Sequence, residues 1–114
     1  MVGQEAGDRR TYPRSLEARF VVGPYGVIEE VNAAALALVG YTEEELVGAH
    51  GSLVVPRETQ PATAVSVDRM RRGEITTRVG HLLRRDGTVL VVDIRSRPLS
   101  DGRIVLIVRE CRAA

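Results

Sequence analysis

The sequence predicts an α+β domain in which an antiparallel sheet carries its helices on one face. Two observations predict this class. β-rich segments lie toward both ends of the chain, and three helical segments with clear end signals separate them. The C-terminal β-rich region is also divided by Asp86-Gly87 and Asp101-Gly102, dipeptides typical of tight hairpin turns. With 114 residues, 44% of them hydrophobic, the chain has the length of one globular domain.

The N-terminal region predicts a lead-in followed by a β-hairpin. Residues 1–15 show no apolar periodicity, so we expect a flexible lead-in or a short capping helix there, with the domain itself spanning residues 16–112. Ala18–Val22 and Val27–Val31 are short runs of strand-forming residues. The Gly23-Pro24-Tyr25-Gly26 segment between them favours a turn, because proline presets φ and glycine accepts positive φ.

Three helices are expected in the middle of the chain. Asn32 is a good N-cap for a helix over Ala33–Val39. Thr42 and Glu45 have the spacing of a capping box, which predicts the start of a second helix. A longer helix is predicted over Thr59–Arg72, with proline in its first turn and arginines near its carbonyl end.

The C-terminal region predicts three further strands. We place them at Glu74–Arg84, Thr88–Leu99 and Arg103–Glu110. Alternate residues of a strand point to opposite faces, so the apolar set that starts at Leu90 should face the helices.

Several segments resemble those of the Per-Arnt-Sim (PAS) sensor domains in their order and spacing. The resemblance covers the chain from about Leu16 to Arg112. One departure is Gly23, where many members of that family have aspartate. The segments that carry the resemblance are Gly26-Val27-Ile28, Val31-Asn32-Ala33-Ala34, Leu38 to Gly48, Gly73-Glu74, Arg84-Arg85-Asp86-Gly87-Thr88 and Val108-Arg109-Glu110.

The resemblance implies a five-stranded antiparallel sheet in the order 2-1-5-4-3, with the helices forming a cup over one face. It also implies a sensory or dimerisation module of a bacterial-type signal transduction regulator, such as a two-component or transcription regulator, and no enzyme. Residues 113–114 would then begin a connector to a covalently linked output domain. The same resemblance implies either a small molecule or cofactor bound in the cup or a signal relayed through a dimer interface.

Two other function classes remain open from the residues. A small cup-shaped isomerase or hydrolase would need an acid and base pair in the cup, and we find no candidate catalytic residues. A nucleic-acid contact could use the segment from Arg69 to Arg85, which holds six arginines and one glutamate. Aromatic residues are missing from that segment, and the net charge of +1 gives no strong general attraction to nucleic acid or lipid.

The cofactor remains unknown, and three known PAS chemistries are disfavoured. A flavin adduct or a hydroxycinnamoyl chromophore needs a thiol after the second helix, where Gly48 to Leu53 has none, and Cys111 lies at the far end of the chain. Haem needs an axial histidine on the long helix, which has none. We expect His50 and His81 to be solvated or hydrogen-bonded, and we predict no metal site.

The candidate ligand-binding residues are those expected on the inner face of the sheet and helices. Most are apolar, which favours a small, mainly apolar ligand, although a packed core without any ligand fits the same pattern. Arg78 is a further polar residue that could reach the cup. The candidates are Phe20, Val22, Leu36, Val39, Leu46, Leu53, Val67, Met70, Leu90, Val92, Ile94, Ser96, Leu106 and Val108.

The outer face of the sheet is also apolar near its centre. A sheet face open to water normally carries polar residues, so we expect a cover: a second protomer in a homodimer, a short helix near Tyr12 to Ala18 that acts as a lid, or both. The candidate interface residues are Val21, Val89, Val91, Val105 and Ile107.

The composition also bears on location. No apolar run approaches the roughly 20 residues that span a membrane, and the polar start has no signal-peptide pattern. The single cysteine excludes an intrachain disulfide, so we expect a cytoplasmic protein.

Overall fold

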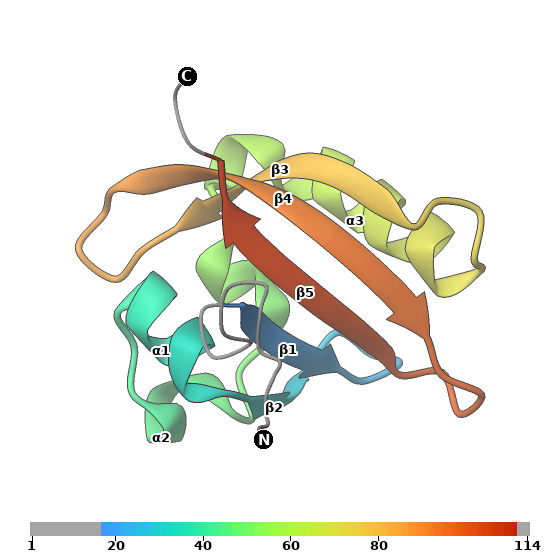
Figure 1. The fold of residues 1–114 in the computed structure, drawn as a ribbon, viewed down its shortest axis with the longest axis horizontal. Coiled ribbons are helices and arrows are strands. Elements are labelled where there is room, and N and C mark those ends of the chain that lie inside the picture. Colours follow the sequence, from blue (N-terminus) through green and yellow to red (C-terminus); the bar gives the residue numbers. More distant parts are fainter. Residues whose placement is uncertain (1–16, 112–114) are drawn as a thin grey trace, which may run out of the picture.

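The computed structural model describes residues 17–111, so the expected lead-in and connector lie outside the described residues. A five-stranded antiparallel sheet runs through the molecule in the order β2-β1-β5-β4-β3 (Figure 1). This order and the antiparallel pairing confirm the expected fold. The strands are β1 (Ala18–Val22), β2 (Ile28–Val31), β3 (Thr77–Leu83), β4 (Val89–Pro98) and β5 (Ile104–Glu110).

The helical part of the chain lies between β2 and β3. It contains the three expected α-helices and two 3-10 turns. The helices are α1 (Ala33–Val39), α2 (Glu43–Leu46) and α3 (Gln60–Arg71), and the 3-10 turns are η2 (Gly51–Val54) and η3 (Arg57–Thr59).

The side chains expected to start the first two helices do so. The Asn32 side chain accepts a hydrogen bond from the Ala35 amide at the start of α1. At α2, the Thr42 hydroxyl accepts from the Glu45 amide while the Glu45 carboxylate accepts from the Thr42 amide, which completes the capping box. These bonds satisfy backbone amides that have no partner within their own helix.

The two aspartate-glycine turns also form as expected. Gly87 and Gly102 have φ of 90° and 89°, a region that other residues adopt only with strain. The Asp86 carboxylate accepts from the Thr88 amide, and the Asp101 carboxylate accepts from the Arg103 amide. The turns therefore join β3 to β4 and β4 to β5 as antiparallel hairpins.

The core lies between the sheet and the helices. In β4, alternate residues from Leu90 to Ser96 point inward, and Val92 is fully buried. Val39 of α1 and Leu46 of α2 are also fully buried and belong to the same cluster. The inner face of β4 is therefore the one that its alternation predicts.

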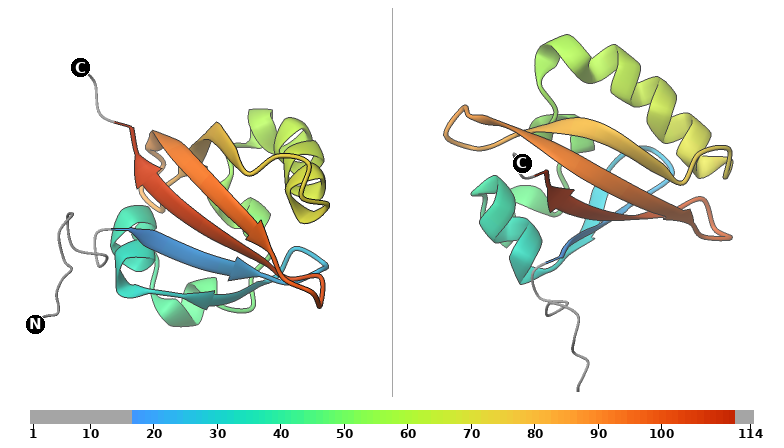
Figure 2. Two further views of the ribbon diagram at one scale, coloured as in Figure 1. Left: turned by 45° about the vertical axis from the view of Figure 1, so that its right-hand side comes forward. Right: turned by 45° about the horizontal axis from the view of Figure 1, so that its top comes forward.

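The helices cover two different parts of the sheet (Figure 2). The views place α1 and α2 toward β1 and β2, whereas α3 lies beside β3 and β4. Only Met70 is buried in α3, although this helix has 12 residues. Among residues 17–111, no helix is long and apolar enough to cross a bilayer.

Candidate ligand cavity

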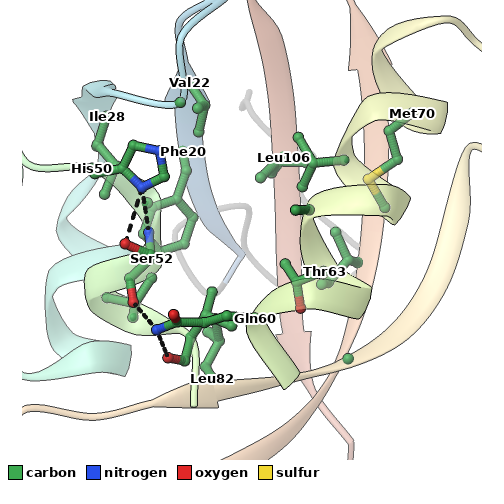
Figure 3. Close-up of a pocket in the computed structure, with 18 of the residues that line it drawn as sticks. Phe20, Val22, Ile28, His50, Ser52, Gln60, Thr63, Met70, Leu82 and Leu106 are labelled. Carbon is green, nitrogen blue, oxygen red and sulfur yellow. Dashed lines mark hydrogen bonds between the residues drawn. The ribbon is translucent and has the colours of Figure 1, made fainter. Parts of the chain in front are cut away.

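A cavity of about 380 Å³ lies under α3. Its walls come from α3, the η2 segment, the turn between β1 and β2, and the inner face of the sheet. In Figure 3, Thr63 and Met70 of α3 lie on one side of the space, and Ile28 and His50 lie on the other. This volume falls near the lower end of the roughly 300–1,000 Å³ that is typical of small-molecule sites.

The cavity exists because α3 presents small side chains to the sheet. The lining residues of this helix recur at the spacing of a single helical face. Thr63, Ala64 and Val67 occupy the middle of that face, and their side chains are too short to fill the space above the strands. The complete α3 lining is Gln60, Thr63, Ala64, Val67, Met70 and Arg71.

The floor of the cavity is almost entirely hydrocarbon. It comes from β1, β2, β3, β4 and β5, and it places alkyl and aromatic groups opposite α3. Contact with such a surface favours an apolar ligand, since burial of apolar area is worth about 25 cal/mol per Å². The floor residues with apolar side chains are Phe20, Val22, Ile28, Leu82, Ile94, Leu106 and Val108.

His50 stands at one wall of the cavity. Its Nδ1 accepts a hydrogen bond from the Ser52 amide at 3.1 Å, so in the neutral ring Nε2 carries the proton. The ring lies against Gly26, where an added Cβ would approach Nε2 to 2.5 Å. The histidine is therefore hydrogen-bonded, as expected, and it shapes the cavity wall through a contact that only glycine permits.

Gln60 ties the first turn of α3 to the η2 segment. Its Nε2 donates to the Val55 carbonyl at 3.2 Å and reaches the Ser52 carbonyl at 3.4 Å (Figure 3). These bonds connect the two covering elements at one end of the cavity.

Arg71 ties the other end of α3 to the sheet. Its Nη2 donates to the Gly23 carbonyl at 2.8 Å and its Nε donates to the Gly102 carbonyl at 3.2 Å. The sequence explains this arginine only as a helix-end charge. In the structure it instead joins the last turn of α3 to two separate hairpin turns.

Arg78 enters the cavity from the edge strand β3. It pairs with Ile94 on the inner face, and its guanidinium lies beside Gly80. Its Nε donates to the Val79 carbonyl at 3.3 Å. The expectation that Arg78 reaches the cup therefore agrees with its place in the lining.

Half of the candidate ligand-binding residues line this cavity. They come from β1, α3, β4 and β5, whose inner faces follow from simple periodicity. These residues are Phe20, Val22, Val67, Met70, Ile94, Leu106 and Val108.

The other seven candidates do not line this cavity. Five belong to the core or pack against it, where tight contact leaves no space for a ligand: Leu36, Val39, Leu46, Leu90 and Val92. Leu53 is 36% exposed on η2. The Ser96 hydroxyl donates to the Ile75 carbonyl at 3.4 Å and does not line the cavity.

The sequence-based list misses the polar part of the lining. Gln60, Thr63 and Arg71 share the helical spacing of Val67, so the same periodicity could have identified them. Gly80 interrupts a strand, which often marks a close approach of another group. The sequence around Tyr25, which also lines the cavity, has no pattern that predicts this position.

The outer face of the sheet differs from the expected continuous patch. Val21 and Val105 are only 2% and 5% exposed in the single chain. Asp93 pairs with Arg109 across β4 and β5, so a charged pair of residues separates Ile107 from Val91. The exposed apolar residues of this face are Val89 and Val91 at the start of β4 and Val79 on β3, which pairs with Asp93.

Cys111 lies at the end of β5, away from the cavity lining. Its backbone amide donates to the Val91 carbonyl. Partial burial and the nearby Asp93 carboxylate raise the pKa of the Cys111 thiol above its usual range. Within residues 17–111, no three histidine, cysteine, aspartate or glutamate side chains are grouped so as to hold a metal ion.

Comparison with known proteins agrees with this geometry. A family model described as "PAS fold" matches residues 14–113. No curated protein sequence matches the chain.

Solved structures show the same arrangement. A domain of the sensory box sensor histidine kinase/response regulator from Geobacter sulfurreducens has a TM-score of 0.75 at 24% identity, covering 86% of each chain. The PAS domain of an HTR-like protein from Haloarcula marismortui has a TM-score of 0.67 at 27% identity, covering 86% of this chain and 89% of that one. The PAS domain of the Cronobacter turicensis RpfR quorum-sensing receptor, in complex with C12:0, has a TM-score of 0.75 at 13% identity, covering 90% and 100%.

Proposed function

The chain belongs to the PAS fold family, and from this premise we propose that it is a sensory, non-enzymatic domain that binds a small, mainly apolar ligand under α3. PAS domains are typical of sensor histidine kinases and other signalling proteins. The observation that carries the proposal is the cavity of about 380 Å³ with its hydrocarbon floor. The RpfR domain, in complex with C12:0, supports a ligand of this kind within the same fold.

The proposed mechanism couples the cavity to the sheet. A ligand that contacts both α3 and the inner side chains of β5, such as Leu106, stabilises one spacing between the helix and the sheet. We propose that this change passes along β5 toward an output domain in a cytoplasmic, bacterial-type regulator of two-component signalling or transcription. Arg71 is a direct connection in this path because it bonds α3 to the turn before β5.

Filling the cavity tests the proposed function. Val67→Trp places a large side chain in the cavity, whereas Val65→Trp places the same side chain at a position of α3 that is 62% exposed. With octan-1-ol as the probe, a titration followed by amide chemical shifts should show saturable binding to the unmodified chain. We expect Val67→Trp to weaken that binding by about tenfold or more, a loss of about 1.4 kcal/mol, and Val65→Trp to leave it unchanged.

Two results of this titration would contradict the proposal. One is the absence of saturable shifts in the unmodified chain. The other is equal binding by Val67→Trp and the unmodified chain, since binding would then take place outside the cavity. Far-UV circular dichroism of both variants establishes that they are folded.

Relay through a homodimer is the second candidate function. It is favoured by the exposed side chains of Val79 on β3 and of Val89 and Val91 at the start of the neighbouring strand β4. Exposed apolar groups of this kind gain free energy when a second protomer covers them. The surface is smaller than the sequence predicts, because Val21 and Val105 are already buried.

A further inference from the structure

The charges around the cavity have one sign. Its lining contains two arginines, Arg71 and Arg78, but no aspartate or glutamate. A mainly apolar space bordered by guanidinium groups has a positive potential, and the low dielectric of its walls strengthens that potential. An anionic group is therefore favoured inside this cavity over a cationic one.

Arg71 and Arg78 differ in how far their hydrogen bonds are satisfied. Arg71 donates through Nε and Nη2 to two backbone carbonyls, which fixes it as a structural connection. Arg78 donates only through Nε, to the carbonyl of the next residue. Its two terminal nitrogens make no hydrogen bond or ion pair with any residue of the described range 17–111.

The position of the Arg78 guanidinium depends on Gly80. A Cβ at residue 80 would lie 3.4 Å from Nη2 of Arg78 and 3.0 Å from Cδ1 of Ile94. The missing side chain therefore leaves room for the guanidinium beside the apolar floor. Asp93, the nearest acidic residue of β4, pairs with Val79 on the outer face and forms no ion pair with Arg78 among the described residues.

These observations together describe a part-buried cation with free donors next to a hydrocarbon surface. A carboxylate accepts two parallel hydrogen bonds from the terminal nitrogens of arginine, which makes it a well-matched partner. An alkyl chain on that carboxylate would lie between α3 and the strands, along Val67 and Leu106. Both chemical features of the cavity are then satisfied by one amphipathic molecule.

We propose that the ligand class of this cavity is the aliphatic carboxylates, with the carboxylate bound by Arg78 and the alkyl chain under α3. This inference rests on the proposed function, because it names the chemistry of the same ligand site. It separates two roles among the lining arginines: Arg78 binds the ligand, and Arg71 holds the helix.

The test compares three probes that share one alkyl chain: octanoate, octan-1-ol and octylamine. Near neutral pH their head groups are anionic, neutral and cationic. Isothermal titration calorimetry of the full chain should give the order octanoate, then octan-1-ol, then octylamine. We expect octanoate to bind about tenfold or more tightly than octan-1-ol, since hydrogen bonds to charged groups have this magnitude.

The variants assign that preference to one residue. Arg78→Gln should reduce octanoate affinity by about tenfold and remove most of the preference for octanoate over octan-1-ol. Arg97→Gln removes the same charge from an exposed position on the outer face of β4, and it should leave both affinities unchanged. Arg78→Lys retains the charge without the planar pair of donors, so we expect an intermediate octanoate affinity.

The outcomes distinguish the carboxylate assignment from the proposed function, which is the binding of an apolar ligand under α3. If octan-1-ol binds as tightly as octanoate to the unmodified chain, or if Arg78→Gln keeps the octanoate preference, the carboxylate assignment is overturned while the apolar site stands. If none of the three probes binds, both the site and its ligand class are overturned. The order of the probes on the unmodified chain tests the assignment even where a variant fails to fold.

Discussion

Asn32 joins three parts of the chain through one side chain. Its Oδ1 accepts from the Ala35 amide at 2.9 Å and from the Arg19 amide at 3.0 Å, and its Nδ2 donates to the Glu17 carbonyl at 2.9 Å. The N-cap that the sequence predicts therefore also ties the start of α1 to β1. A side chain with only a capping role would make the first of these bonds alone.

We predict that Asn32→Ala destabilises the domain by about 2 kcal/mol, because it removes a helix cap and leaves further backbone groups without their partner. The measurement is the free energy of unfolding from urea denaturation. Asn32→Asp is the matched control, since it keeps the Oδ1 acceptor and loses only the donor to Glu17. If both variants lose the same free energy of unfolding, the Oδ1 acceptor that Asn32→Asp retains does not contribute to stability.

Glu45 makes the stability of α2 dependent on pH. The Thr42 backbone amide is the largest cause that lowers the pKa of the Glu45 carboxyl below its ordinary value of 4.5, and the Arg85 charge and the Thr42 hydroxyl lower it further. Arg85 also forms an ion pair with this carboxylate at 2.7 Å. A carboxyl with a depressed pKa in the folded state stabilises that state above its unfolded pKa, and this contribution is lost as pH falls through the folded pKa.

We predict that Glu45→Gln removes part of the loss of stability below about pH 4.5, because a neutral side chain does not titrate there. Urea midpoints measured at neutral pH and at successive values below 4.5 give the dependence. Glu44→Gln is the control, since the neighbouring Glu44 has no capping bond. A Glu45→Gln profile that falls as steeply as that of the unmodified chain would contradict the assignment.

At the scale of elements, α3 differs from the other helices in how it is held. A cavity separates part of α3 from the sheet, and Met70 is the only buried residue of this helix. Polar bonds at its two ends, from Gln60 and Arg71, therefore carry much of its attachment. An element attached in this way can respond to a ligand because it has few apolar contacts to break.

We predict that Arg71→Met lowers the stability of the domain by about 2 kcal/mol and selectively increases hydrogen exchange in α3, since two part-buried hydrogen bonds to backbone carbonyls lose their charged donor. Exchange measured residue by residue checks this. Arg69→Met is the control in the same helix. It removes a half-exposed ion pair between Arg69 and Glu74, and we expect it to lower the free energy of unfolding by less than about 1 kcal/mol. Uniform exchange throughout the sheet and helices of Arg71→Met would argue against a local attachment.

At the scale of the whole molecule, the two faces of the sheet serve different purposes. The inner face combines a tight core with a cavity, and the outer face alternates charged residues with small apolar groups. A homodimer, if it uses the outer face, has to form around the exposed valines of β3 and β4.

We predict that the unmodified chain self-associates at micromolar concentration and that Val91→Arg shifts it toward monomer, because the substitution places a charge in the apolar contact. Sedimentation velocity provides the measurement. Val65→Arg makes the same change on the exposed side of α3 and should leave the association unchanged. A monomer for the unmodified chain over the whole concentration range would exclude the homodimer.

The sequence alone determined the features that depend on neighbouring residues. The capping bonds of Asn32 and Thr42 and the turns at Asp86 and Asp101 join groups only a few residues apart, so their spacing is visible in the chain. The family resemblance added the order of the strands, which local patterns alone do not specify.

Only the tertiary structure decided where a ligand can fit. Periodicity places Val39, Leu46 and Val67 on inner faces alike, but the first two are buried in tight contact and the third borders a cavity. The distance between a helix and the sheet depends on the summed volumes of side chains from distant segments, which no local pattern records. The apolar surface of the outer face could not be predicted from the sequence for a similar reason. Asp93 lies opposite Arg109 and divides that surface, and the register between strands is a property of the assembled sheet.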